Sequence, residues 1–361
     1  MKSGLKNVLF TLLTLALIAG VALAVPQGSI TQEAQRSYLE EGPAVEDDYA
    51  FLFEYAAAGM MNIWRETQMK KWLALLCAVL LPALALGEAT PTLPMDFTPG
   101  HVADPANYTE NGYEDETLSV IMERVWVGDA QFNVARVKIA DPSQLRIGLA
   151  APFGTKKTNR VSTIARDNNA VVAIGGDYFA NEEGGYVVRM GEAYRKKPLK
   201  SRDMLVTDSK GNFHILKNSD ATQLQALMEA EDPIVNVFNF GPALVIDGVL
   251  QEMPETYKYN INGKEPRCAI GQLGELEYLL VVVDGRGAAD SEGCDVATLA
   301  QFMYEQGCTH AYNLDGGNSG LMYFNGENYS RKSFEAERSV SDIIYFSTAI
   351  DYGLDETAEE E

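Results

Sequence analysis

Short apolar runs that end in Asp-Gly or glycine-rich turns constrain this chain most strongly, because they are typical of β-strands joined by tight turns. Pairs of such runs flank a turn at three places and predict hairpins over residues 120–139, 204–216 and 243–250. Residues 278–283 form a continuous apolar run, as expected for a central strand buried on both faces. The pattern predicts that β-structure dominates this part of the chain.

Helices are predicted at three places, where apolar residues recur with the helical period: residues 161–168, 221–230 and 295–306. The third is the clearest, since Asp295 can cap its start and Gly307 its end. It lies between the apolar runs 278–283 and 309–314, an order that predicts a strand–helix–strand crossover. The predicted fold class is therefore α+β, with a large mixed, mostly antiparallel β-sheet core and a few packed helices.

Changes in composition divide the chain into four parts. Two apolar segments, 8–25 and 72–86, mark residues 1–87 as a signal or anchor region. The other three parts are a linker at 88–115, rich in Pro, Thr, Asp and Asn, a main domain at 116–349 and a solvated acidic tail at 350–361.

Both apolar segments follow lysines, as the hydrophobic part of a secretory signal does, and the second ends in small residues that suit a cleavage site. Three interpretations stay open. In the first, the natural start is Met69; in the second, residues 8–25 are a membrane anchor. In the third, both segments span the membrane, although residues 72–86 are shorter than the roughly 20 residues of a typical span. We expect the main domain to be secreted or membrane-anchored outside the cytoplasm. If both segments span the membrane, one of the two topologies leaves the domain on the cytoplasmic side.

The charge balance argues against one class of partner. The chain has 51 Asp and Glu residues against 29 Lys and Arg residues, a formal net charge of −22. An acidic surface repels nucleic acid, so no nucleic-acid partner is expected. The sequence has no CxxC, HExxH or GxxxxGK[ST] motif and no GxGxxG after a strand, which argues against zinc and nucleotide sites. No cofactor is predicted, although Asp-rich turns leave a bound divalent cation open.

Two of the cysteines raise the question of a disulfide. Cys294 and Cys308 flank the third predicted helix, which is about 20 Å long at 1.5 Å per residue. A disulfide between them therefore requires the chain to double back. The alternative is that Cys268, Cys294 and Cys308 are free and buried.

Candidate catalytic carboxylates follow two predicted strands. Asp315 begins a glycine-rich turn after residues 309–314, and Asp284 follows residues 278–283. Backbone N–H groups in such a turn can bind an anion, and two carboxylates at neighbouring strand ends are the minimum for glycoside hydrolysis. The alternatives are ordinary turns in which the two Asp residues only cap the chain.

Arginines near these turns supply positive charge. Arg267 begins a predicted strand and Arg338 precedes residues 340–346, and either guanidinium can bind a phosphate with two N–H groups. The alternative for each is a structural ion pair, and Arg286 can simply pair with Asp284.

A serine hydrolase is a competing enzyme class. Ser319 lies in Gly317-Asn318-Ser319-Gly320-Leu321, which departs from G-x-S-x-G at its last position. His310 can supply a base, but it lies on the preceding strand, five residues before Asp315. The pattern therefore fits this class poorly.

Six motifs in this order resemble the phosphodiester glycosidase family. They are Gly175-Gly176-Asp177-Tyr178-Phe179, Gly241-Pro242-Ala243-Leu244, Asp247-Gly248, Pro266-Arg267-Cys268-Ala269-Ile270-Gly271, Val283-Asp284-Gly285-Arg286 and Asn313-Leu314-Asp315-Gly316-Gly317. Ser319 and Arg338 also fit, and the resemblance covers residues 120–349. The chain departs from the family at Gly176 or Asp177, where an Asn is usual, and at Asn318, where a Gly is frequent.

The resemblance implies hydrolysis of a sugar-1-phosphodiester at the anomeric carbon, giving free sugar and a phosphate monoester. It implies Asp315 as nucleophile or base and Asp284 as a supporting carboxylate. The residues expected to bind substrate are Arg267, Arg286, Arg338, Ser319 and the Gly316 and Gly317 amides for the phosphate, and Asn313 and Asp177 for the sugar. The expected partner is a sugar phosphodiester, either a small molecule or a cell-envelope polymer. The alternative, if the protein is not an enzyme, is a non-catalytic envelope module that binds phosphosugar polymers.

Overall fold

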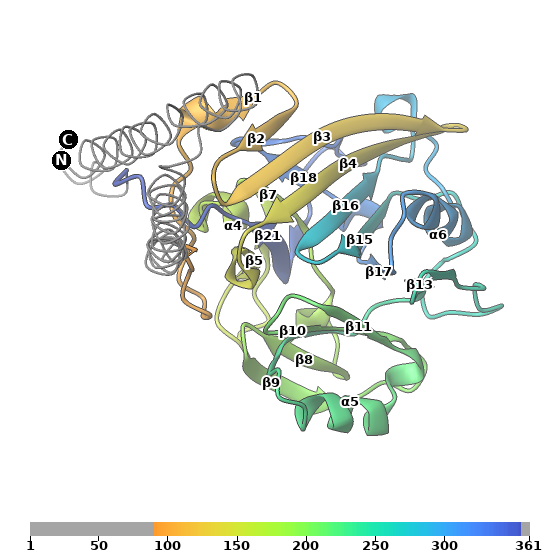
Figure 1. The fold of residues 1–361 in the computed structure, drawn as a ribbon. Helices are drawn as coiled ribbons and strands as arrows, with labels where there is room; N and C mark the ends of the chain where they lie inside the picture. Colours follow the sequence, from red (N-terminus) through yellow and green to blue (C-terminus); the bar gives the residue numbers. More distant parts are fainter. Residues whose placement is uncertain (1–89, 355–361) are drawn as a thin grey trace, which may run out of the picture. The chain divides into compact units, whose positions relative to one another are not determined.

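The computed structural model describes residues 90–354 of the chain (Figure 1). The two apolar segments predicted at 8–25 and 72–86, and most of the predicted acidic tail, lie outside the described residues. Among residues 90–354, no helix has the length and apolar character needed to cross a membrane.

The largest sheet has nine strands in the order β1-β2-β3-β4-β16-β15-β17-β13-β14. Its strands are β1 (Tyr108–Thr109), β2 (Gly112–Glu114), β3 (Leu118–Val127), β4 (Ala130–Ile139), β13 (Ala243–Ile246), β14 (Val249–Leu250), β15 (Arg267–Gly274), β16 (Glu277–Val283) and β17 (His310–Leu314). The predicted hairpins 120–139 and 243–250 are confirmed as β3–β4 and β13–β14. We call this the main sheet.

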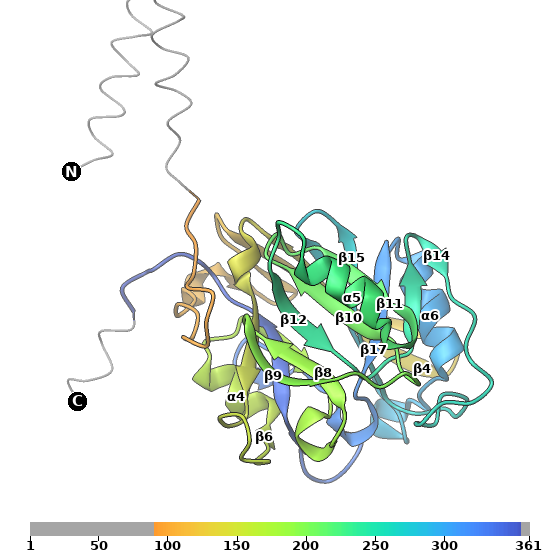
Figure 2. The ribbon, with the colours of Figure 1, turned by 90° about the horizontal axis from the view of Figure 1, so that it is seen from below.

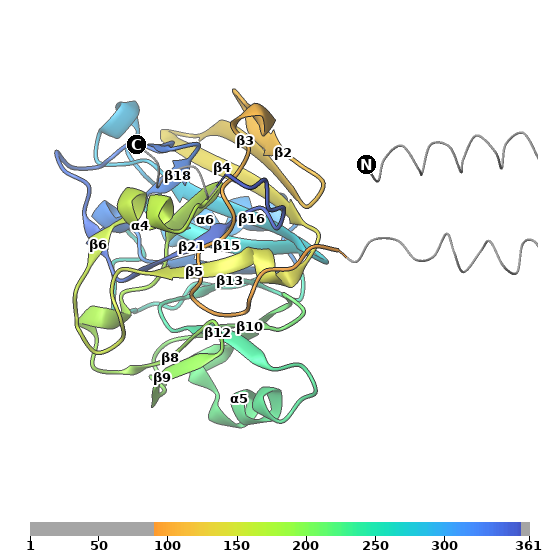
Figure 3. The same cartoon turned by 90° about the vertical axis from the view of Figure 1, so that its left-hand side faces the viewer.

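Two five-stranded sheets pack beside the main sheet. One has the order β11-β10-β12-β8-β9 and consists of β8 (Gly185–Arg189), β9 (Glu192–Lys197), β10 (Met204–Asp208), β11 (Phe213–Leu216) and β12 (Ile234–Phe238). The other has the order β19-β18-β7-β21-β5 and consists of β5 (Leu145–Leu149), β7 (Val172–Gly175), β18 (Met322–Phe324), β19 (Glu327–Asn328) and β21 (Asp342–Phe346). A short ladder joins β6 (Asn159–Arg160) to β20 (Ser339–Val340). Figures 2 and 3 show these sheets from two further sides.

The three predicted helices are confirmed as α4 (Val161–Asp167), α5 (Ala221–Met228) and α6 (Val296–Glu305). The Asp295 side chain accepts the Thr298 amide at the start of α6, and Gly307 has a positive φ just beyond its end. Short 3-10 helices complete the structure: η1 (Pro105–Asn107), η2 (Pro142–Gln144), η3 (Phe179–Asn181), η4 (Lys217–Ser219), η5 (Ala288–Asp290) and η6 (Gly317–Ser319). The predicted α+β class is confirmed.

Every strand pair in the described part of the chain is antiparallel. The sheets are therefore purely antiparallel, whereas we expected a mixed sheet. The predicted strand–helix–strand crossover is present, but it does not produce a parallel strand pair. β16 and β17 run in the same direction, but both pair with β15, which lies between them. The helix α6 therefore connects two parallel strands that are not neighbours.

The main sheet is buried on both faces, as the continuous apolar run of β16 predicts. On one face, Val281 and Val283 pack with Leu299 and Phe302 of α6. On the other face, the alternate residues of the same strands pack against the two five-stranded sheets in a single large core. The main sheet is thus the central layer, and its strand ends carry the residues singled out by sequence.

The segment predicted as a linker at 88–115 is not an extended linker where it is described. It contributes β1 and β2 to the edge of the main sheet, and its Leu93 is buried. The guanidinium of the buried Arg146 holds the segment by donating to the carbonyl oxygens of Pro94, Asp96 and Thr98. Composition alone missed this, because backbone carbonyls carry no sequence signature.

The cysteine alternatives are resolved for the described residues. Cys268, Cys294 and Cys308 are free and buried. Burial raises the pKa of each thiol, so none is poised as a thiolate.

Candidate active site

A cavity of about 230 Å³ lies at one end of the three central strands of the main sheet. Arg267, the first residue of β15, pairs in register with Val283, and Cys268 pairs with Leu314. The start of β15 therefore lies between the ends of β16 and β17. The residues that line the cavity are Phe240, Tyr259, Asn260, Ile261, Glu265, Arg267, Arg286, Asn313, Leu314, Asp315, Gly316, Gly317, Asn318 and Arg338.

Asp315 follows β17 directly and lines this cavity. Its amide donates to the Gly176 carbonyl at 3.3 Å, which fixes the start of the turn. Burial raises the pKa of the carboxyl to about 6, and a hydrogen bond from Ser319 and the nearby Arg338 charge only partly oppose that shift. The negative charge of Asp177 raises this pKa further. A carboxyl that titrates near neutrality beside a cavity has the property expected of an acid–base group or nucleophile.

The glycines after Asp315 are required by close backbone approach. A Cβ on Gly316 would lie 2.6 Å from the Pro266 carbonyl oxygen, and Gly317 has a φ of +57°. The Gly317 amide donates to that same Pro266 oxygen at 2.8 Å, so this predicted anion-binding group is already engaged. The Gly316 amide makes no backbone hydrogen bond to another described residue, so it is available to an anion.

Arg286 is one of the residues that line the cavity. Its Nε donates to Glu265 Oε2 at 2.7 Å and its Nη1 to Asn318 Oδ1 at 2.6 Å. It therefore pairs with Glu265 and not, as we considered, with Asp284. Its Nη2 lies 3.4 Å from where a Gly317 Cβ would be, directly over the turn.

Arg338 is the second cation at the cavity. Its guanidinium lies over the Tyr178 ring, 5.8 Å from the centroid. It is exposed and has no ion-pair partner within residues 90–354. An exposed arginine outside any ion pair is well suited to bind an anionic ligand.

Arg267, by contrast, uses its guanidinium to hold backbone. It is buried, and Nε, Nη1 and Nη2 donate to the carbonyl oxygens of Cys294, Asn260 and Gly263 at 2.7–2.9 Å. Three of its five N–H groups are thereby committed. The prediction that it binds phosphate rests on the other two.

Asn313 lies in β17 and lines the cavity. Its Nδ2 donates to the Gly241 carbonyl at 2.8 Å, while its buried Oδ1 has no hydrogen-bond partner among the described residues. An orphaned buried acceptor in a cavity wall is costly unless a ligand donates to it.

Asp284 does not line the cavity that Asp315 lines. Val283 and Arg267 are register partners on one face of the sheet, and alternation along the strand directs Asp284 to the other face. There Oδ1 accepts the Arg331 amide at 2.9 Å, and Oδ2 is buried without a partner among the described residues. Burial raises the pKa of this carboxyl, and Asn133 and Arg124 beside it act in the opposite direction.

Asp177 is likewise engaged away from the cavity, in a buried group with Arg189 and Asp342. Arg189 Nη2 lies 3.0 Å from Asp177 Oδ1, and Arg189 Nε lies 2.6 Å from Asp342 Oδ2. Asp177 Oδ2 also accepts the Asn239 amide at 3.2 Å. Its oxygens are thus occupied, so the expected contact with a sugar hydroxyl has little support in its position.

An aromatic wall that we did not predict closes one side of the cavity. Phe240 and Tyr259 stack with ring centroids 4.3 Å apart and planes 5° apart. The Tyr259 hydroxyl donates to Glu182 at 2.8 Å, and Tyr257 donates to the Phe240 carbonyl at 2.6 Å. The only sequence signal was the pair of tyrosines in an otherwise polar segment, which does not reveal its distant partner.

The serine hydrolase alternative lacks a base. Ser319 is buried beside Asp315, whereas His310 lies at the opposite end of β17, with its Nε2 3.2 Å from Asp247 Oδ1. His310 and His214 line a different cavity of about 640 Å³. Within the described residues, no three His, Cys, Asp or Glu side chains are grouped to hold a metal ion.

Comparison with known proteins gives a consistent result. Residues 168–347 match the family model described as phosphodiester glycosidase. The chain is 27% identical over 200 residues to the SPbeta prophage-derived uncharacterized protein YomE of Bacillus subtilis, covering 54% of this chain and 30% of that protein. It is 25% identical over 205 residues to N-acetylglucosamine-1-phosphodiester alpha-N-acetylglucosaminidase of Bos taurus, covering 51% of this chain and 37% of that enzyme. The chain thus spans about a third of the length of these curated relatives.

The fold is also similar to a solved structure. The catalytic domain of the zebrafish N-acetylglucosamine-1-phosphodiester alpha-N-acetylglucosaminidase, auto-inhibited by its pro-peptide, superposes with a TM-score of 0.51. The match has 18% sequence identity and covers 70% of this chain and 87% of that chain. At this identity the likeness supports the fold.

Proposed function

The chain belongs to the phosphodiester glycosidase family, and we propose that it hydrolyses a sugar-1-phosphodiester at the anomeric carbon. The observation that carries the proposal is Asp315, a carboxyl with a pKa of about 6 in a cavity that also presents Arg286 and Arg338. Such a site combines a group that can act on the anomeric carbon with positive charge for a phosphate.

The proposed reaction breaks the bond between the anomeric carbon and the bridging phosphate oxygen. The water oxygen becomes bonded to the anomeric carbon, one water proton is accepted by the base, and the phosphate leaves as a monoester. A phosphate is a weak base, so it needs less protonation on departure than an alkoxide does. The site must mainly stabilise the positive charge developing on the sugar and the negative charge on the phosphate.

The positions of the side chains suggest how these tasks are divided. Asp315 acts as nucleophile or as base toward water, and the Ser319 hydroxyl orients it. Arg338, the free Nη2 of Arg286 and the Gly316 amide bind the phosphate. The sugar lies against the aromatic wall of Phe240 and Tyr259, where Asn313 Oδ1 accepts one of its hydroxyl groups.

Three residues from the sequence prediction have a smaller part in this proposal. Arg267 and Asp177 position the backbone around the cavity through the bonds described above. Asp284 is not used as the second carboxylate, because it does not line the cavity. Glu265 lines it instead, paired with Arg286.

The location outside the cytoplasm is proposed on the sequence alone. Residues 69–87 have the charged, apolar and small-residue order of a secretory signal. Expression of the full chain with a reporter fused to its carboxyl end, followed by fractionation, tests this. Recovery of all the protein in the cytoplasmic fraction would refute it.

The test of activity uses the full chain and a chromogenic N-acetylglucosamine-1-phosphodiester, the sugar being chosen from the names of the bovine and zebrafish relatives. Release of free reducing sugar together with phosphate monoester is expected. Asp315→Asn should lower kcat about a thousandfold, as expected when an acid–base group or nucleophile is removed. Asp247→Asn is the matched control, because Asp247 also precedes a glycine in a turn but lines the other cavity.

Three results would contradict the proposal. Full activity in Asp315→Asn would remove this residue from the mechanism. Binding of sugar phosphodiesters without turnover by the unchanged chain would point to a binding module. Labelling of Ser319 by a fluorophosphonate would point to a serine hydrolase.

A further inference from the structure

Positive charge is concentrated in one segment of this acidic chain. Residues 151–202 hold ten of the 29 Lys and Arg residues but only five of the 51 Asp and Glu residues. The segment is therefore net positive, while the rest of the chain carries the whole negative excess. Two of its acids, Asp177 and Glu182, are already paired with arginines.

Seven exposed cations of this segment have no ion-pair partner among the described residues. One of them, Arg166, lies on α4. The other six are Lys156, Lys157, Arg160, Lys196, Lys197 and Lys200. We call them the basic rim. Of the lysines elsewhere in the described residues, Lys138, Lys210 and Lys264 each have a carboxylate partner within 2.8–3.3 Å, whereas Lys332 has none. In a chain of net charge −22, carboxylates to pair with are abundant, so a group of unpaired cations is a distinct feature.

The basic rim is connected to the cavity through direct contacts. Arg160 in β6 pairs with Ser339, the residue after Arg338. On the other side, Phe153 stacks on Tyr194 of β9 at 4.6 Å, which holds the loop bearing Lys156 and Lys157 against the strand bearing Lys196 and Lys197. Figures 2 and 3 both show β6 and the β8–β9 hairpin on the same side of the domain.

The same aromatic cluster leads back to Arg338. Phe179 contacts both Phe153 and Tyr194, and its carbonyl accepts Arg195 Nη2 at 3.0 Å. Its neighbour Tyr178 is the ring over which Arg338 lies. The unpaired cations thus continue outward from the cation that lines the cavity.

The number of these charges exceeds what one scissile group needs. A single phosphodiester carries one negative charge, which Arg338 at the cavity already balances, since Arg286 is paired with Glu265. Six more cations along one side create a positive field that attracts further negative charges on the same ligand. A neutral glycoconjugate or a protein-linked glycan would leave them without a partner.

We propose that the substrate is a polyanion, a polymer whose sugar units are joined by repeated sugar-1-phosphodiester linkages. The basic rim binds the phosphates next to the one being cleaved, so that the chain of the polymer runs from the cavity across β6 and β9. This inference rests on the proposed function for the reaction, but the binding of the polymer can be measured without turnover.

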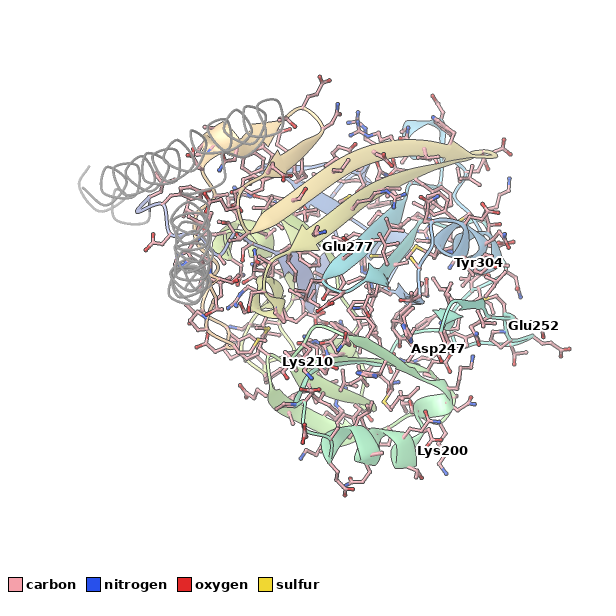
Figure 4. All side chains as sticks on the ribbon, in the orientation of Figure 1. Lys200, Lys210, Asp247, Glu252, Glu277 and Tyr304 are labelled. Atoms are coloured by element: carbon pink, nitrogen blue, oxygen red, sulfur yellow. The ribbon has the colours of Figure 1, made fainter. Side chains whose placement is uncertain are left out.

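The test compares two substrates, the short diester used above and a polymer of the same sugar 1-phosphate unit. Two double variants, Lys156→Gln/Lys157→Gln and Lys196→Gln/Lys197→Gln, each remove two charges from the basic rim. Lys138→Gln/Lys210→Gln is the matched control, because it removes equal charge elsewhere. Figure 4 shows Lys210 and Glu277, the partner of Lys138, well separated from Lys200.

We expect kcat/KM for the polymer, relative to that for the short diester, to fall about tenfold in each rim variant and less than about twofold in the control. The rim variants should also show a weaker dependence of polymer binding on salt concentration, because fewer counterions are released. An equal fall in the rim and control variants, or no fall in either, would overturn the proposal.

Binding to the polymer separates this inference from the proposed function. It is measured with the Asp315→Asn chain by fluorescence anisotropy, with single-stranded DNA of equal charge as competitor. Displacement of the polymer by DNA at equal concentration would show a general polyanion site and overturn the inference. If the unchanged chain cleaves the short diester but does not bind the polymer, the inference fails and the proposed function stands. If it binds the polymer through the basic rim but cleaves neither substrate, the proposed function fails.

Discussion

The chemistry of the candidate site depends on the protonation state of Asp315. Burial holds the pKa of its carboxyl at about 6, so the group is mostly ionised at neutral pH and mostly protonated below about pH 5. If it acts as nucleophile or base, only the ionised form works. We therefore expect kcat/KM to rise with pH through about 6 and to level off above it. A profile that instead falls through this range would assign the residue as a general acid.

Ser319 provides a sharper test at the same scale. Its hydrogen bond favours the ionised form of Asp315 and lowers the pKa of that carboxyl. Ser319→Ala removes this bond, so the acidic limb of the kcat/KM profile should move to higher pH, by about half a unit to one unit. Ser119→Ala, on the exposed face of β3, is the control and should leave the limb in place. An unchanged limb in Ser319→Ala would mean that another group controls it.

At the scale of elements, the sequence predicted several of the buried strands but not β5, β8 and β12, which are also buried. β16, β17 and α6 were found because continuous or periodic apolar runs end at glycine turns. β9 was missed because its sequence, Glu-Ala-Tyr-Arg-Lys-Lys, is that of a half-exposed edge strand without apolar alternation. β1 and β2 were missed because two or three residues are too few to show a period.

The candidate site was predictable to the extent that its residues follow strand ends. Asp315, Arg286, Asn313 and Arg338 do line one cavity. The stack of Phe240 on Tyr259 was not predictable, because it joins two segments that no local pattern relates. The placement of Asp284 depended on which face of β16 its side chain takes, and the strand register decides that.

Arg267 links the strands to the wall of the cavity and carries a prediction of its own. Its three hydrogen bonds hold residues 260–263 and Cys294 at the start of β15. Lysine keeps the charge but cannot reach three carbonyls in a planar fork, so Arg267→Lys should lower the free energy of unfolding by about 3 kcal/mol. It should also raise KM, because Tyr259 and Asn260 lose their support.

Denaturant unfolding and steady-state kinetics measure both effects. Arg195→Lys is a suitable control, since Arg195 also donates to two backbone carbonyls but lies outside the cavity. If Arg267 acted mainly by binding phosphate, lysine would preserve stability and only KM would change.

For the whole molecule, the buried group of Asp177, Arg189 and Asp342 connects the sheets. Arg189 belongs to β8, Asp342 to β21 of the other five-stranded sheet, and Asp177 lies in the loop after β7, which also touches the start of the Asp315 turn. Burial raises the pKa of Asp342, and the Arg189 charge opposes that shift. Two carboxylates therefore share one buried cation, and the arrangement of the sheets around the cavity depends on it.

Removing that cation should destabilise the fold, with a pH dependence of known sign. Arg189→Met leaves two buried carboxylates without a counter-charge and should cost about 3–5 kcal/mol of unfolding free energy at neutral pH. Without the guanidinium the pKa of Asp342 rises further in the folded state, so the folded chain binds more protons than the unfolded chain. The unfolding free energy of the variant should therefore fall as pH is raised from about 5 to about 8, relative to that of the unchanged chain.

Adding Asp342→Asn removes one of the two charges and should restore part of the loss. Denaturant unfolding of the single and double variants at both pH values measures this, and additive losses without any pH dependence would show that the two residues are not coupled.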